Sequence, residues 1–154
     1  MTPRRVLCAL AVLLVAVGIC SAQDPNVGTW KLNESKSKLA AGMPKNLMVK
    51  VEAAGDSTKV TVDGVDGMGK PTHNEWTGKS DGKDYPVTGD PNSDSRAYKK
   101  VDDRTMDLTV KKGGKVTMSG KIVTSADGKS RTVTVHGMDA SGKEVQAVSV
   151  YDRQ

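Results

Sequence analysis

A repeated turn signal is the feature of this sequence that most restricts its fold. Five turn-like stretches place glycine directly before lysine, at Gly69-Lys70, Gly82-Lys83, Gly114-Lys115, Gly128-Lys129 and Gly142-Lys143. Glycine adopts the positive φ angles of tight hairpins, and a preceding Asp or Gly supports the same turns. Because the segments between the pairs do not match one another, the pattern predicts a series of hairpins and not a solenoid of repeats.

Apolar and polar residues alternate between these turns, which is the pattern of half-buried strands. Further breaks occur at 54–56, 89–92 and 101–104. Within each predicted strand the apolar residues share one face. These groups are Leu47, Val49 and Val51; Val60 and Val62; Met106, Leu108 and Val110; Val116, Met118 and Ile122; and Val133 and Val135. We therefore predict an all-β domain, a single antiparallel up-and-down barrel of about 8–10 strands, since consecutive hairpins close a barrel without long crossovers.

The segment 34–45 interrupts the alternation. It is rich in serine and lysine, and Gly42 and Pro44 would end any helix that began there. We expect a loop with at most one helical turn over 36–41, and so no full helical lid. Both a cover over one mouth of the barrel and a simple connection fit this sequence.

The first 22 residues have the composition of a secretory signal peptide. Two arginines precede an apolar run of fifteen residues, 6–20, and small residues follow it. An apolar run of this length is too short for a membrane anchor, and the bulky Ile19 argues against acylation of Cys20. We expect cleavage after Ala22 and a secreted or periplasmic protein without stable membrane insertion.

Cleavage would leave one domain, residues 23–154. Both cysteines lie in the first 22 residues, so this domain would have no disulfide. The 23 lysines and arginines of the chain include Arg4 and Arg5, which leaves 21 against 18 acids and a formal charge of +3. A charge this mild does not indicate a nucleic-acid partner. We expect a monomer.

No metal, cofactor or catalytic site is predicted. His73 and His136 are far apart in the sequence and the domain has no cysteine, so paired metal-ligand spacing is absent. The run 90–94 resembles the start of an EF-hand loop but lacks the glycine and glutamate that should follow, which favours a polar turn. Residues 35–38 match Ser-x-x-Lys without the further motifs of the penicillin-recognising enzymes. The sequence therefore predicts that the protein is not an enzyme.

The two ends of the domain resemble those of a known superfamily. Gly28-Thr29-Trp30-Lys31-Leu32 is similar to the opening strand of the calycins, which include the lipocalins and the intracellular fatty-acid-binding proteins. Val150-Tyr151-Asp152-Arg153 is similar to the close of the fatty-acid-binding barrel. The domain as a whole resembles small secreted bacterial lipocalin-like proteins of unassigned function.

The resemblance implies a closed barrel with a structural signature formed by Gly28, Trp30 and Arg153, in which the arginine packs over the indole. It also implies a ligand inside the barrel. Two features of the fatty-acid-binding proteins are missing here. The arginine that they carry two residues before the terminal tyrosine is Ser149, and the connection after the first strand is too short for their helix-turn-helix lid. Of their carboxylate-binding motif only Tyr151 remains.

A third group of residues is a candidate for ligand contact. Arg96, Tyr98 and Lys100 share one face of a predicted strand. On the surface they would form a solvated stripe, whereas facing the lumen they could hold an anionic head group, with Trp76 or Tyr151 packing on its apolar part. The candidate ligand-binding residues are therefore Arg96, Tyr98, Trp76 and Tyr151.

Two functions from different classes follow from this sequence. The first is the binding of a small apolar or amphipathic molecule inside a lipocalin-like barrel. The alternative is a packed barrel without a small ligand, whose loops bind another protein as an interaction or inhibitor module.

Overall fold

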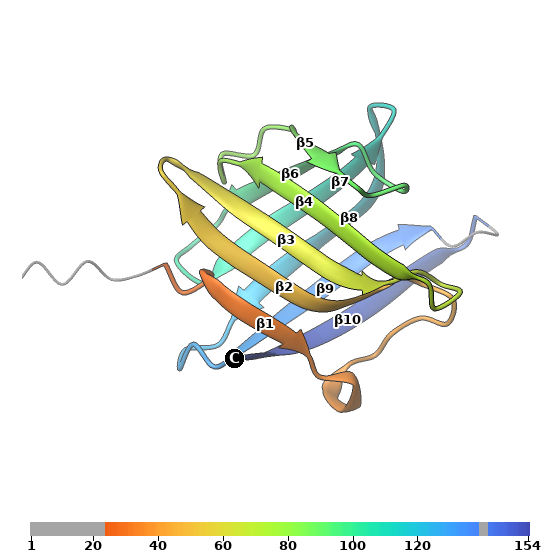
Figure 1. Ribbon diagram of the computed structural model, residues 1–154, viewed down its shortest axis with the longest axis horizontal. Helices are drawn as coiled ribbons and strands as arrows, with labels where there is room; N and C mark the ends of the chain where they lie inside the picture. The colour runs from red at the N-terminus through yellow and green to blue at the C-terminus, as the bar shows by residue number, and fades with distance from the viewer. Residues whose placement is uncertain (1–23, 139–141) are drawn as a thin grey trace, which may run out of the picture.

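The strands begin and end where turns break the alternation (Figure 1). The structure is a computed structural model that describes residues 24–138 and 142–154. The strands are β1 Gly28–Leu32, β2 Lys45–Ala54, β3 Ser57–Val65, β4 Pro71–Gly78, β5 Tyr85–Thr88, β6 Ser95–Lys100, β7 Thr105–Lys112, β8 Lys115–Thr124, β9 Ser130–Met138 and β10 Glu144–Arg153. A single turn of 3-10 helix, η1 Glu34–Lys36, follows β1.

The strands of the described residues close into one antiparallel barrel, in which each strand pairs with its neighbours in sequence. β1 lies between β2 and β10 and completes the circle. Trp30 of β1 faces Val49 on one side and Arg153 on the other, and Figure 1 shows the C-terminus beside this first strand. Closure gives every strand a neighbour on both sides. The predicted all-β up-and-down barrel is confirmed.

The predicted Gly–Lys turns are present. Each of the five glycines lies in a connection between consecutive strands, and their φ angles run from 68° at Gly128 to 83° at Gly69. Residues with a Cβ rarely adopt such angles. The breaks predicted near Gly55 and Gly89 also have positive φ, 61° and 79°. The spacing of glycine in the sequence therefore sets the lengths of most strands.

The hydrophobic core lies inside the barrel. Trp30 and Trp76 are its largest fully buried side chains, exposed to 0% and 1%. The other buried members of this cluster are Leu32, Val49, Val51, Val60, Val62, Val87, Tyr98, Met106, Ile122 and Tyr151. Removal of this apolar surface from water is the main term that stabilises a fold of this kind.

Two β-bulges change which side chains point inward. The pairing register shifts near the start of β2 and near the start of β8. A bulge adds one residue to a strand and so reverses the alternation beyond it. The prediction that Leu47 shares a face with Val49 is wrong, because Leu47 is 37% exposed. The prediction that Val116 shares a face with Met118 is wrong for the same reason, and Val116 is 59% exposed.

The connection from β1 to β2, residues 33–44, is a loop with one short helical turn, as predicted. The turn is η1, which begins and ends earlier than the predicted span 36–41. After η1 the chain runs beside β10, where Lys38 pairs with Val148, and it then crosses to the start of β2. We call residues 37–44 the strap, and the end of the barrel where they lie the strap end.

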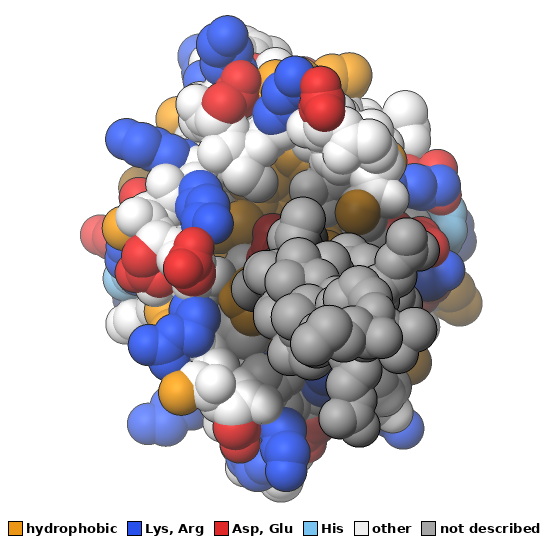
Figure 2. All heavy atoms as spheres, turned by 90° about the vertical axis from the view of Figure 1, so that its left-hand side faces the viewer, with side chains coloured by type: hydrophobic (Ala, Val, Ile, Leu, Met, Phe, Trp, Pro, Cys, Tyr) orange, Lys and Arg blue, Asp and Glu red, His pale blue; other side chains and the backbone are white. Residues whose placement is uncertain are grey.

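The opposite end of the barrel contains the start of β1, and we call it the first-strand end. Figure 2 looks onto this end. Lysine and arginine side chains lie among aspartate and glutamate side chains around its rim, and hydrophobic side chains are visible in the recess inside the rim. A rim that carries both signs of charge fits the mild net charge of the chain.

The signal peptide predicted for residues 1–22 lies outside the described residues. Within the part that the structure describes, no helix is long and apolar enough to cross a membrane.

Candidate ligand-binding site

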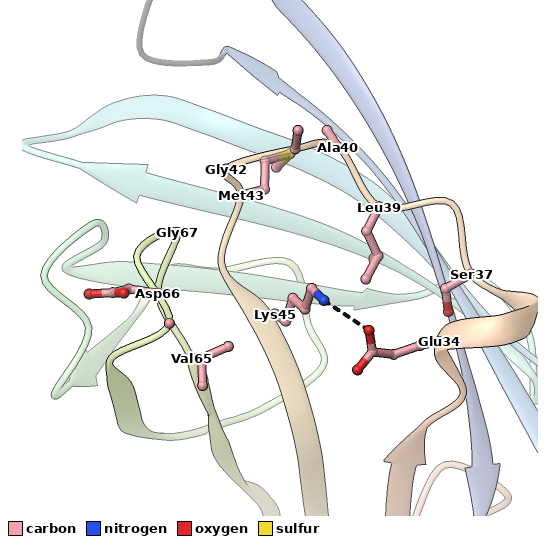
Figure 3. Close-up of a pocket in the computed structure, with 12 residues that line it drawn as sticks. Glu34, Ser37, Leu39, Ala40, Gly42, Met43, Lys45, Val65, Asp66 and Gly67 are labelled. Carbon is pink, nitrogen blue, oxygen red and sulfur yellow. Dashed lines mark hydrogen bonds and ion pairs between the residues drawn. The ribbon is translucent and has the colours of Figure 1, made fainter.

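A gap in the barrel wall lies at the strap end. β1 ends at Leu32, and its pairing with β2 stops at Met48, so the first residues of β2 have no partner on β1. The strap spans this gap between β10 and β2. A cavity of about 460 Å³ lies beneath it (Figure 3). That volume falls within the range of small-molecule sites in proteins.

The cavity wall is partly apolar and partly charged. Its apolar side chains come mainly from the strap and include Leu39, Ala40 and Met43. Its charged side chains include Lys45 and Glu34, whose Nζ and Oε2 atoms form an ion pair of 2.8 Å. A wall of this composition suits a molecule that has both an apolar and a polar part.

Leu39 connects the cavity with the barrel interior. It is partly buried, lines the cavity and packs against the core cluster. Figure 3 shows its side chain projecting from the strap on the side of the Lys45–Glu34 pair. The cavity and the interior of the barrel therefore meet at Leu39.

Several side chains that point inward toward the strap end keep part of their surface exposed. Six residues at inward-pointing positions of their strands are only partly buried, namely Leu108, Met118, Val133, Val135, Val145 and Ser149. In a closed barrel the exposed surface of an inward-pointing side chain faces the lumen. Val135 has Gly120 opposite it on β8 and Ala147 opposite it on β10.

Three of the four candidate residues lie together on one side of the interior. The ring centroids of Trp76 and Tyr98 are 4.6 Å apart, and Tyr85 lies 5.9 Å from Trp76, both in edge-to-face contact. The indole Nε1 of Trp76 donates a hydrogen bond of 3.1 Å to the carbonyl oxygen of Arg96. The interpretation of Arg96 and Tyr98 as part of a solvated stripe is wrong, because they are 9% and 8% exposed. Lys100 is exposed, as that interpretation required.

The guanidinium of Arg96 is engaged within the chain. Its Nη2 lies 2.7 Å from Oδ2 of Asp90. Burial acts to raise the pKa of Asp90, but hydrogen bonds from Ser93, from the Asn92 N–H and from Arg96, together with the Arg96 charge, hold it below its ordinary value. Arg96 therefore belongs to a structural ion pair that anchors the turn before β6.

Trp30 lies between two guanidinium groups. Cζ of Arg153 is 4.4 Å from the centroid of its ring, and Cζ of Arg131 is 5.2 Å away. The indole Nε1 donates a hydrogen bond of 3.1 Å to the carbonyl oxygen of Asn26. The contact between Arg153 and Trp30 that the calycin resemblance implies is present in the structure.

Arg153 is held by backbone carbonyls as well as by the indole. Its Nε donates to Gly128, its Nη1 to Val27 and its Nη2 to Pro25, over 2.6, 2.7 and 2.6 Å. Gly28 has a φ of 148°, and a Cβ there would lie 2.5 Å from Nη1 of Arg153. The glycine of the Gly-x-Trp signature is therefore required by the close approach of this guanidinium.

Arg131 is the residue that the sequence reasoning missed. It is 5% exposed and points inward from β9, opposite Tyr151, which is 3% exposed. Its Cζ lies 5.5 Å from the centroid of the Tyr151 ring. Arg131 has the same parity as Val133 and Val135, so the alternation already placed it on the inward face.

The two histidines lie outside the interior. His73 is 59% exposed, and its Nδ1 lies 2.6 Å from Oδ1 of Asp63. His136 is exposed on β9, in a position of the outward parity. Among residues 24–138 and 142–154, no three His, Cys, Asp or Glu side chains are placed to hold a metal ion together.

No protein-family model and no curated protein matches this sequence. A structure of EF1p2_mFAP2b bound to DFHBI is similar with a TM-score of 0.47 and 12% identity, over 84% of this chain and 94% of that one. Lobster apocrustacyanin A1 is similar with a TM-score of 0.43 and 11% identity, over 86% of this chain and 63% of that one. Likenesses at these TM-scores and identities carry no inference about this protein.

Proposed function

We propose that the barrel binds a small apolar or amphipathic molecule in its lumen. The observation that carries this proposal is the set of partly exposed, inward-pointing side chains between the core and the strap end, among them Leu108, Val133 and Val135. Apolar surface that stays in contact with water inside a closed barrel is stabilised when a ligand covers it. The gap beneath the strap provides a route to that surface.

The strap is the element that would admit the ligand. It crosses from β10 to β2 after the backbone pairing of Lys38 with Val148. Leu39 would pack against an apolar ligand, and the Lys45–Glu34 pair would lie near its polar end. We infer that the protein is a monomeric, secreted or periplasmic binding protein and not an enzyme.

Filling the lumen should abolish binding without unfolding the protein. Val135→Phe places an aromatic ring on the inward face of β9, opposite Gly120 and Ala147. We expect affinity for the neutral apolar fluorophore 1-aminoanthracene to fall at least about tenfold. The measurement is a fluorescence titration, with circular dichroism to check the fold. Thr134→Phe is the matched control, because Thr134 is next to Val135 in β9 and points outward.

The outcome separates the two classes of function. Retained affinity in a folded Val135→Phe protein would contradict binding in the lumen. If the wild-type protein binds no small apolar probe at all, the alternative function is favoured, in which the loops at the strap end bind another protein. Met68 and Met138 are 90% and 66% exposed there, and exposed methionines suit adaptable protein contacts.

A further inference from the structure

The most exposed hydrophobic side chains of the barrel gather at the strap end. Among the described residues, Met68, Met138 and Val116 are exposed to 90%, 66% and 59%, more than any other large hydrophobic side chain. The first lies in the turn between β3 and β4, the second at the end of β9 and the third near the start of β8. Figure 1 shows these three places at the same end of the barrel. Apolar side chains that gather on one part of a surface indicate a site of interaction.

Exposed lysines stand beside these apolar side chains. Lys70 follows Met68 in the same turn. Lys112 and Lys115 flank the two glycines of the β7–β8 turn, and they are directly paired across this hairpin. All three lysines are exposed, and within the described part of the chain none of them forms an ion pair. Like charges that face each other across paired strands repel, so an anionic partner would relieve the Lys112–Lys115 pair.

The acids in the neighbouring turns are held by the chain itself. Asp66 accepts two hydrogen bonds of 2.9 Å from backbone N–H groups of its own turn. Asp94 accepts one of 2.7 Å from the N–H of Gly113, at the tip of the β7–β8 turn. Glu144 is exposed at the start of β10, and the three lysines outnumber it. The acidic oxygens therefore face the backbone, while the lysine side chains can meet an external anion.

This arrangement fits a fluid surface better than a rigid one. The three apolar side chains come from different connections of the rim, and none of them lines the cavity beneath the strap. Separate apolar protrusions with lysines beside them can each enter a lipid interface, because the apolar part meets the acyl boundary and the ammonium group meets the headgroups. Methionine, which supplies two of the three, is flexible and adapts to such a surface.

We propose that the strap end docks reversibly on the surface of an anionic lipid bilayer. Met68, Val116 and Met138 enter the headgroup region, and the three lysines contact anionic headgroups. The side chains of turns enter the interface while the barrel stays in water, so docking differs from membrane insertion. This activity goes beyond the binding of a ligand in the lumen and does not depend on it.

Vesicle sedimentation tests the proposal. The protein is exported and processed, and its mass is checked, because the apolar run 6–20 of the leader would itself bind vesicles. It is titrated with vesicles of phosphatidylcholine alone and with vesicles of phosphatidylcholine and phosphatidylglycerol in equal amounts. We expect wild-type protein to bind the anionic vesicles at least about tenfold more tightly than the neutral ones, and we expect added salt to weaken this binding.

A pair of charge variants locates the contact. Each lysine close to an anionic membrane strengthens binding roughly fivefold, so Lys112→Gln combined with Lys115→Gln should weaken binding to anionic vesicles at least about tenfold. Lys99→Gln combined with Lys129→Gln is the matched control, because it removes the same charge from exposed positions near the first-strand end. We expect this control to bind like wild type. An equal loss in both double variants would show attraction by net charge alone and would overturn the proposal.

A pair of apolar variants tests the contact with the lipid interface. Met68→Ser combined with Met138→Ser removes apolar surface without changing the charge, and we expect affinity for anionic vesicles to fall at least about tenfold. Val101→Ser combined with Val123→Ser is the control, at positions that are 52% and 42% exposed near the first-strand end, and it should bind like wild type. Unchanged binding by the methionine variant would mean adsorption by charge alone, which contradicts the proposal. Circular dichroism checks the fold of each variant.

Failure of docking and failure of lumen binding are distinguishable. The vesicle titrations contain no lumen ligand, and the titration with 1-aminoanthracene contains no vesicles. Wild-type protein that sediments with neither kind of vesicle would overturn docking and leave lumen binding intact. The exposed methionines would then favour a protein partner at the strap end.

Discussion

Trp30→Ala is expected to lower the free energy of unfolding by about 3–5 kcal/mol, a large share of the total for a domain of this size. Trp30 is fully buried, and its Nε1 bonds the carbonyl of Asn26. Its loss would leave a cavity where β1 closes the barrel. Arg153 would lose its aromatic contact, and Arg131 would keep only its contact with Tyr151. Urea denaturation measures the change. Val123→Ala, at a 42% exposed position, is the control and should change stability little.

The coupling of Trp30 with Arg153 tests how the barrel closes. Arg153 forms three hydrogen bonds to backbone carbonyls. Arg153→Met should therefore lower the free energy of unfolding by about 1.5–3 kcal/mol, more than the loss of the contact with the indole would alone. Because the two side chains touch, the losses should fail to add by at least about 0.5 kcal/mol in the double mutant. Strict additivity would show that the contact does not contribute to stability in solution.

Asp90→Asn is expected to lower the free energy of unfolding at neutral pH by about 3 kcal/mol, because it leaves the guanidinium of Arg96 buried without a counter-charge. The two side chains are 16% and 10% exposed. Asparagine keeps the size of the side chain and an oxygen for hydrogen bonds, so the change isolates the charge. Thermal or urea denaturation measures it. Asp103→Asn, which removes an 89% exposed carboxylate from a surface pair, should cost little.

The same pair predicts a dependence on pH. The pKa of Asp90 is lower in the folded protein than its ordinary value of about 3.9. Its stabilising contribution is therefore complete above that ordinary pKa and is lost as pH falls through the lower folded pKa. The difference in stability between wild type and Asp90→Asn should shrink as pH falls below about 4. A difference that stayed constant down to pH 2 would contradict this assignment.

Much of the fold could be predicted from local chemistry. Glycines such as Gly69 and Gly128 take the positive φ angles that hairpins require, and the alternation of Val60 with Val62 marks an inward face. The bulges that expose Leu47 could not be predicted in this way. A bulge is a property of two paired strands, and the register of a pair is set by both.

The candidate site was predictable only in part. Trp76 and Tyr98 do lie together inside the barrel, but Arg96 is paired with Asp90, a contact made across a turn that no alternation reveals. The sequence could have predicted that Arg131 points inward, because it lies two residues before Val133 in the same alternating pattern. The gap beneath the strap could not, because it arises from how far β1 extends relative to β2 and β10 in space.

The most direct test of lumen binding is NMR with methyl-labelled valine and leucine during titration with decanoate. We expect shifts and intermolecular contacts at Leu108, Val133 and Val135, which point inward and are partly exposed. Val116 and Val123 are 59% and 42% exposed and lie outside the core cluster, so their methyl groups serve as controls that should not respond. Changes confined to Val116 and Val123, or no changes at any of the five residues, would contradict a ligand inside the barrel.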